Sequence, residues 1–181
     1  MDYYPMMKSR HGLGLRWAQQ LLALVLVTAG QARAESPMAP TPCADRGTAV
    51  VVRTREHRLY ACEVNEVVAS YGIRLGRKGT GKTKAGDGKT PLGTYRLGVP
   101  RPSKKYGIFI PVGYPTTEQR RRGHTGGAIG VHGPLRSVRW LGRAVNWFDT
   151  SDGCVGLATD DEMEALADWV RAHGARTITL E

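Results

Sequence analysis

The sequence predicts a mainly β domain of the α+β class, with one helix late in the chain. Residues 48–53, 57–63 and 67–75 form three successive runs rich in β-branched and aromatic residues, separated by turn-like residues. Many short strands with a single helix are typical of a β-sandwich or barrel. Further short runs of strand character cover residues 94–99, 108–112, 128–132, 154–157 and 177–180.

The helix is predicted from residue 160 onward. Thr159 and Glu162 have the spacing of a capping box, and acidic residues fill the first turn. Gly174 follows as a stop signal. The apolar face expected to pack on the sheet recurs at helical spacing and consists of Met163, Leu166, Ala167 and Val170.

Residues 1–34 have the parts of a signal peptide. Basic residues precede a short apolar run at residues 21–27, and Ala32-Arg33-Ala34 has the small-x-small pattern that signal peptidase reads. The apolar run is shorter than the ~20 residues of a membrane span, so we expect cleavage after Ala34, with an uncleaved anchor as the alternative. The product would be exported to the periplasm or cell wall without an integral membrane span. Residues 35–47 would be a short linker, and residues 48–181 one domain that we expect to be monomeric.

The chain carries a formal net charge of +10, which falls to about +7 without the residues of the predicted signal peptide. Outside the cytoplasm such a surface suits an anionic polymer such as the cell wall. The basic residues are scattered and belong to no nucleic-acid-binding motif, so we expect no nucleic-acid partner. A merely solvated surface explains the charge equally well.

Residues 76–83, GRKGTGKT, match the phosphate-binding pattern G-x-x-x-x-G-K-[ST]. A P-loop requires a helix directly after the match, because the N-terminus of that helix faces the phosphates. Here the following residues, KAGDGKTPLG, contain three glycines and a proline and cannot begin a helix. We therefore expect a glycine-rich loop that binds no nucleotide.

The chain has three cysteines, an odd number, so in an oxidising compartment a disulfide would leave one thiol free. Cys43 precedes the first predicted strand and Cys62 ends the second, which places these two well for a disulfide. Cys154 would then be the free thiol.

Residues 128–157 contain the residues best suited to chemistry. His132-Gly133 ends one predicted strand, and Ser151-Asp152-Gly153-Cys154 enters the next. An imidazole within hydrogen-bond reach can take the proton of a thiol and make it a nucleophile. Gly153 would allow backbone amides near the thiol to face a developing oxyanion.

Three other readings of these residues remain open. Cys154 and His132 could be ordinary buried residues. His132, Asp152 and Cys154 could hold zinc, although a structural site would need a fourth ligand. Cys154 could also be a redox-active thiol, which the lack of a C-x-x-C motif disfavours.

The same stretch resembles the signature of the L,D-transpeptidase (YkuD-type) catalytic domain, a His followed after a spacer by [S/T]-H-G-C. Residues 86–97, GDGKTPLGTYRL, resemble the loop and strand before the active site of that family, and the late helix fits its layout. The resemblance covers residues 48–181 and implies the family's β-sandwich or barrel, with one helix after the strand of the catalytic cysteine.

The resemblance implies an exported cysteine acyltransferase that acts on peptidoglycan stem peptides in cell-wall biogenesis and cell shape. Cys154 would form a thioester with the third stem residue, and His132, oriented by the carbonyl of Gly133, would move the proton. Ser151, with the amides around Gly153 and Cys154, would shape the oxyanion site. No metal or organic cofactor is implied. The acceptor would be a stem peptide, a wall-attached lipoprotein or water.

Three positions depart from the family pattern. Asp152 replaces the usual His, and its carboxylate would disfavour a neighbouring thiolate unless an arginine such as Arg136 or Arg139 neutralised it. Gly156 replaces a frequent Asn or Arg, and the spacer from His132 to Ser151 has 18 residues, slightly more than usual.

The departures keep other functions open: an L,D-carboxypeptidase, a hydrolase that releases wall-bound protein, or a non-catalytic peptidoglycan-binding module.

The arginine-rich segment at residues 120–127 is either a solvated loop or a clamp for stem carboxylates. Trp147 either lines the substrate groove or packs under the loop that carries it. The residues expected to contact substrate are Arg136, Arg139, Trp140 and Asp152.

Overall fold

The structure is a computed structural model, which describes residues 41–181. These residues belong to one compact unit. The predicted signal peptide and residues 35–40 of the predicted linker lie outside the described residues. Within residues 41–181, no helix has the length and apolar character required to cross a membrane.

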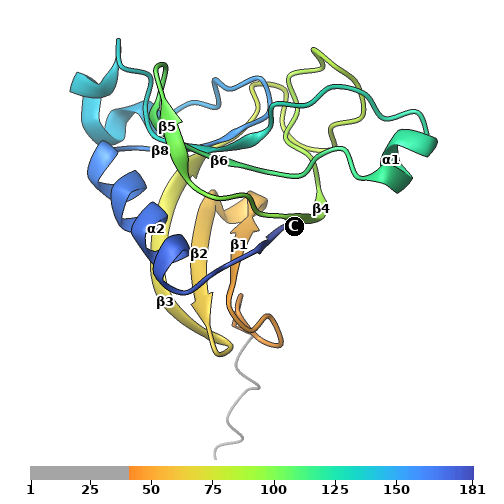
Figure 1. The fold of residues 1–181 in the computed structure, drawn as a ribbon. Coiled ribbons are helices and arrows are strands. Elements are labelled where there is room, and N and C mark those ends of the chain that lie inside the picture. The colour runs from red at the N-terminus through yellow and green to blue at the C-terminus, as the bar shows by residue number, and fades with distance from the viewer. Residues whose placement is uncertain (1–40) are drawn as a thin grey trace, which may run out of the picture. The chain divides into compact units, whose positions relative to one another are not determined.

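The described residues form a mainly β fold, as predicted, with nine strands in the order β4-β9-β1-β2-β3-β8-β7-β6-β5 (Figure 1). The strands are β1 (Ala49–Arg53), β2 (Arg58–Glu63), β3 (Glu66–Arg74), β4 (Gly93–Arg96), β5 (Arg101–Ser103), β6 (Gly107–Pro111), β7 (Gly130–His132), β8 (Val155–Leu157) and β9 (Thr177–Leu180). The helices are α1 (Thr117–Arg121) and α2 (Asp160–Ala172), with 3-10 turns η1 (Thr54–Glu56) and η2 (Arg139–Asn146).

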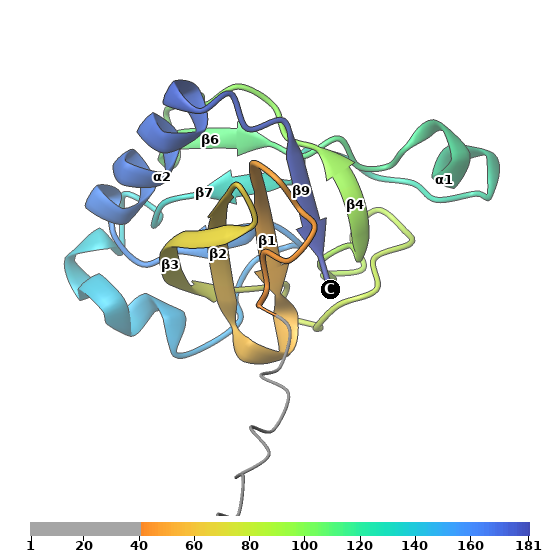
Figure 2. The same cartoon turned by 90° about the horizontal axis from the view of Figure 1, so that it is seen from below.

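The sheet curls into a half-barrel around one hydrophobic core. Strands β1–β3 lie opposite β6 and β7 when the fold is viewed from below (Figure 2). A bridge between Leu97 and Val112 joins segments that follow β4 and β6, near opposite ends of the strand order. Because apolar side chains from both parts of the sheet meet in this core, the ends of β7 and β8 are held in fixed positions.

Helix α2 closes one side of the core (Figure 2). Its buried residues are the four predicted from helical spacing, Met163, Leu166, Ala167 and Val170. Thr159 caps the helix, since its hydroxyl accepts a hydrogen bond from the Glu162 amide. The other arm of the predicted capping box differs, because the Glu162 carboxylate accepts from the amide of Ala158 instead of that of Thr159.

The prediction of a single helix was incomplete. Helix α1, turn η2 and the short strand β5 were not expected. Helix α1 is a single polar turn held by a capping box between Thr116 and Gln119. Strand β5 contains Pro102, a residue that usually weakens a strand assignment, and it pairs only with β6.

Cys43 and Cys62 form a disulfide, the pairing expected from their positions, with Cα atoms 5.3 Å apart. Both residues are fully buried beside Val51. The disulfide ties the segment before β1 to the end of β2. Cys154 is the free cysteine of the described chain.

Candidate active site

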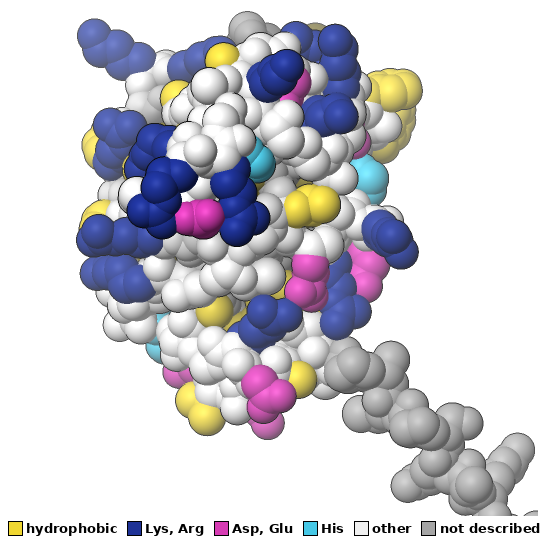
Figure 3. Space-filling model, turned by 90° about the vertical axis from the view of Figure 1, so that its right-hand side faces the viewer, with side chains coloured by type: hydrophobic (Ala, Val, Ile, Leu, Met, Phe, Trp, Pro, Cys, Tyr) yellow, Lys and Arg dark blue, Asp and Glu magenta, His cyan; other side chains and the backbone are white. Residues whose placement is uncertain are grey.

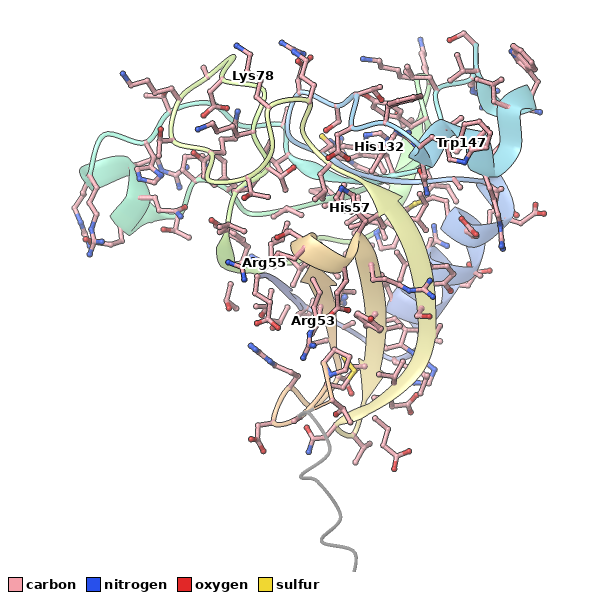
Figure 4. All side chains as sticks on the ribbon, turned by 180° about the vertical axis from the view of Figure 1, so that it is seen from behind. Arg53, Arg55, His57, Lys78, His132 and Trp147 are labelled. Atoms are coloured by element: carbon pink, nitrogen blue, oxygen red, sulfur yellow. A yellow bond between two sulfur atoms is a disulfide. The ribbon has the colours of Figure 1, made fainter. Side chains whose placement is uncertain are left out.

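The candidate active site lies where the parallel strands β7 and β8 run side by side. Val131 pairs with Val155, and His132 with Gly156. This register places His132 at the end of β7 close to Cys154, which directly precedes β8. Figure 4 shows His132 at the same end of the domain as Lys78 and Trp147, which belong to the surrounding loops.

Two cavities meet at Cys154. The first has a volume of about 250 Å³ and also holds His132, Ser151 and Asp152. The second, of about 390 Å³, is lined mainly by the β5–β6 hairpin, including Arg101 and Phe109. The residues that line both cavities are Lys105, Tyr106, Ala128 and Cys154.

His132 is held as a buried, neutral imidazole. Its Nδ1 lies 2.7 Å from the carbonyl oxygen of Gly133, and because a carbonyl only accepts, Nδ1 carries the proton and Nε2 is free as a base. The Tyr106 ring stacks on the imidazole with centroids 3.7 Å apart. Burial lowers the pKa of His132 to about 4, and nearby Arg74 and Lys105 act in the same direction against the Gly133 carbonyl.

The Cys154 thiol is also neutral in this state. Burial raises its pKa, although the Gly130 amide and the charges of Lys105 and Lys82 oppose this effect. Sγ donates to the carbonyl of Ala128 over 3.5 Å and not to His132. The structure therefore brings the thiol and imidazole into one cavity without the direct hydrogen bond expected from sequence.

Ser151 and Gly153 build the turn that presents Cys154. The Ser151 hydroxyl donates to the carbonyl of Cys154 over 2.7 Å and accepts from the Gly153 amide over 3.0 Å. These groups were expected to face an oxyanion, but they are occupied within the turn. Their contribution in this structure is to fix the backbone on either side of the thiol.

Gly153→Ala should destabilise the domain by about 2 kcal/mol. Gly153 has a φ of +127°, and a Cβ there would overlap the carbonyl oxygen of Lys89. Gly79→Ala is the matched control, because Gly79 has a φ of +80° but open space around it; this variant should lose only about 1 kcal/mol. Urea unfolding measures both, and equal losses would show that the contact with Lys89 is unimportant.

The expectation that Arg136 or Arg139 would neutralise Asp152 was wrong. Its carboxylate pairs with Arg77, from the loop after β3, and neither Arg136 nor Arg139 contacts it. The Arg77 amide also donates to the carbonyl of Ser151 over 2.9 Å. The Asp152 side chain is 77% exposed, and the raised pKa of Cys154 is caused by burial and not by this carboxylate.

The loop that resembles a P-loop packs against this turn. Gly76 forms a bridge with Ser151, and no helix begins directly after Thr83. Lys82, the lysine of the pattern, is buried and donates to Asp87 over 2.8 Å and to the carbonyl of Lys84 over 3.1 Å. The lysine that would bind phosphate is thus engaged inside the loop.

The structure does not bring Arg136, Arg139 or Trp140 into the cavities at Cys154. Arg136 and Arg139 line a separate cavity beside α2, where Arg139 lies 3.4 Å from Asp160. Trp140 and Trp147 are 78% and 76% exposed. Both alternatives considered for Trp147 were therefore wrong, since it neither lines a cavity at Cys154 nor packs beneath its loop.

The arginine-rich segment begins in α1 and ends at Gly127, which lines the cavity of Cys154 and His132, but none of its arginines lines either cavity at Cys154. Arg121 and Arg122 both pair with Glu118 at the surface. Figure 3 shows Lys and Arg side chains spread over the face that carries α1, with acidic side chains among them. The geometry favours the solvated loop over the clamp.

Sequence reasoning missed several residues of the site. Arg74, Lys105 and Tyr106 line the cavity of Cys154, and Asn146 hydrogen-bonds Arg74. Arg74 was detectable as the one charged residue within the predicted strand at residues 67–75, but the others carried no local signal. Within residues 41–181, no group of three or more His, Cys, Asp and Glu side chains is arranged to hold a metal ion.

The family model of the L,D-transpeptidase catalytic domain, YkuD, matches residues 47–178. The comparison with curated proteins found no significant match.

Several solved structures are similar to the chain. The helical cell shape determining protein Pgp2 from Campylobacter jejuni has 27% sequence identity and a TM-score of 0.59, over 74% of this chain and 46% of that chain. Bd1075 from Bdellovibrio bacteriovorus has 23% identity and a TM-score of 0.53, over 74% and 47%. An L,D-transpeptidase from Xylanimonas cellulosilytica has 19% identity and a TM-score of 0.47, over 80% and 65%. The chain thus matches about half the length of the first two proteins.

Proposed function

Since the chain belongs to the L,D-transpeptidase catalytic domain family, we propose that it is an exported cysteine acyltransferase that joins peptidoglycan stem peptides. Cys154 is the nucleophile and His132 the base. Pgp2, to which the chain is similar, is a helical cell shape determining protein. We extend a role in cell shape to this chain on that similarity.

The proposed reaction has two halves. The thiol rotates from Ala128 towards Nε2 of His132, which takes its proton while Sγ attacks the carbonyl of the third stem residue. His132 then protonates the leaving amine of the terminal residue, and a thioester on Cys154 remains. An acceptor amine attacks the thioester, gives up a proton to His132 and releases Cys154 as a thiol. Because the Gly153 amide is bonded to Ser151, we assign the oxyanion to the backbone amide of Cys154.

The observation that carries this proposal is the position of Cys154 at the junction of two cavities. A donor peptide in the cavity of His132 leaves the other cavity for an acceptor peptide. Hydrolysis needs only one peptide site, so two cavities that meet at the thiol favour transfer. The pairing of Asp152 with Arg77 weakens the non-catalytic reading, because the carboxylate no longer acts alone beside the thiol.

The test is incubation of the purified protein with disaccharide-tetrapeptide, with products read by mass spectrometry. We expect a cross-linked dimer and loss of the terminal residue, and neither with Cys154→Ala. Tripeptide without dimer would make the protein an L,D-carboxypeptidase. No product from the wild-type protein, with retained binding to sacculi, would favour the peptidoglycan-binding module.

A further inference from the structure

Arg74, at the end of β3, is a buried cation without an acidic partner. It is 4% exposed and lines the cavity that contains Cys154 and His132. Among residues 41–181, no ion pair includes it. Burying a charge without a counter-charge costs several kcal/mol of desolvation free energy. The guanidinium of Arg74 therefore places a positive charge in the cavity, and a bound anion would neutralise it.

Neutral oxygens hold the guanidinium in place. Nη1 donates to Leu157 O over 2.8 Å and to Asn146 Oδ1 over 3.2 Å, and Nη2 donates to Gly133 O over 3.3 Å. A guanidinium has five N–H donors. Nε–H and the second Nη2–H have no acceptor within the described part of the chain. These are the donors available to a carboxylate.

Gly156 makes room for this side chain beside the thiol. Arg74 and Gly156 are paired residues of β3 and β8, and a Cβ on Gly156 would lie 2.6 Å from Cζ of Arg74. Val155 points into the core, so Cys154 and Gly156 share the opposite face of the strand. The guanidinium thus lies about two residues, roughly 6–7 Å, along the strand from the thiol.

We propose that Arg74 is the specificity residue that binds the free carboxylate of the terminal stem residue, the one that leaves when Cys154 is acylated. This inference rests on the proposed function. A peptide whose scissile carbonyl lies at Sγ has its terminal carboxylate one residue further on, about 3.5 Å away. A charge-assisted hydrogen bond of about 3 Å from the guanidinium to that carboxylate covers the rest of the offset. Arg74 thereby restricts the reaction to the last peptide bond of a stem that ends in a free acid.

Binding to a Cys154→Ala background tests the assignment without turnover. Isothermal titration calorimetry compares a tetrapeptide stem ending in a free acid with the same peptide ending in a carboxamide. We expect the acid to bind about 10–100-fold more tightly, the value of a charge-assisted hydrogen-bonded contact. Arg74→Gln should bring the ratio close to one. The matched control is Arg58→Gln, an exposed arginine on β2 outside both cavities, which should keep the wild-type ratio.

A second variant covers the case in which Arg74→Gln does not fold. Asn146→Asp places a carboxylate where the amide oxygen now accepts from Arg74, so an internal anion competes with the substrate. It should lower affinity for the acid and leave the amide unaffected. An acid-to-amide ratio near one in the background protein overturns the inference, as does equal weakening of both peptides by the variants.

The result is distinguishable from failure of the proposed function. Preference for the acid that depends on Arg74, without any product in the mass spectrometry experiment, would support the binding site and reject the acyltransferase. Product formation without preference for the acid would support the acyltransferase and reject Arg74 as the carboxylate-binding residue. A third peptide, amidated only on the side-chain carboxylate of the third residue, identifies the carboxylate. Loss of tight binding with this peptide alone would contradict the assignment to the terminal residue.

Discussion

His132→Gln should slow formation of the thioester on Cys154 by about 10²–10⁴-fold. The neutral thiol needs a base, because burial raises its pKa, and Nε2 of His132 is the base available in the same cavity. Glutamine has nearly the same reach and can donate to the Gly133 carbonyl as Nδ1 does, but it cannot take the proton. Single-turnover intact-mass spectrometry with a tetrapeptide stem measures the acylation rate.

The matched control is His173→Gln, at the C-terminal end of α2, where the imidazole pairs with Glu63 and stacks on the Trp169 ring. It should acylate within about 3-fold of the wild-type rate, because it touches neither cavity. Equal rates in the wild-type protein and His132→Gln would remove His132 from the mechanism. A thiolate absorbance near 240 nm at pH 6 that disappears in His132→Gln would instead show a preformed ion pair, contrary to the neutral resting state described above.

Local sequence patterns predicted most of the fold. Alternating β-branched runs located eight strands, and the helical spacing of Met163 to Val170 identified the buried face of α2. Helix α1 was missed because its residues, TEQRR, have no apolar repeat, so its capping box was the only signal. Strand β5 was missed because three residues that include a proline give no periodicity.

Some residues of the candidate site were also predictable from local sequence, and others were not. His132 and Cys154 were identified because a His-Gly and a Ser-x-Gly-Cys sequence stand at the ends of two predicted strands. The parallel pairing of β7 and β8 brings the two residues close together. Arg77 and Arg74 could not be placed, because their contacts join residues far apart in the chain. Arg77 meets Asp152 only through the packing of the glycine-rich loop on the catalytic turn. Arg74 enters the cavity only because β3 and β8 pair with a glycine opposite it.

The folded domain should lose about 3 kcal/mol of stability as the pH falls from 6.5 to 4 because of His132 alone. An exposed histidine in the unfolded chain takes up a proton near pH 6.5. Burial lowers the pKa of His132 in the folded chain to about 4, so the folded state binds this proton only below that pH. Between the two values the unfolded state binds more protons, so the free energy of unfolding decreases as the pH falls. Urea unfolding at pH 7, 5.5 and 4 measures the loss.

His132→Gln isolates this contribution, because the variant keeps every other titrating group. Asp87 is one of these: burial raises its pKa, but hydrogen bonds from Lys82 and from three backbone amides outweigh that and place it well below its usual range. Its contribution is lost only as its carboxylate is protonated, mainly below pH 4. The variant should therefore lose less stability than the wild-type protein between pH 6.5 and 4. Parallel curves would mean that the imidazole is not held neutral by burial. The same burial keeps Nε2 unprotonated at neutral pH, so this acid sensitivity accompanies a base that is ready to accept the thiol proton.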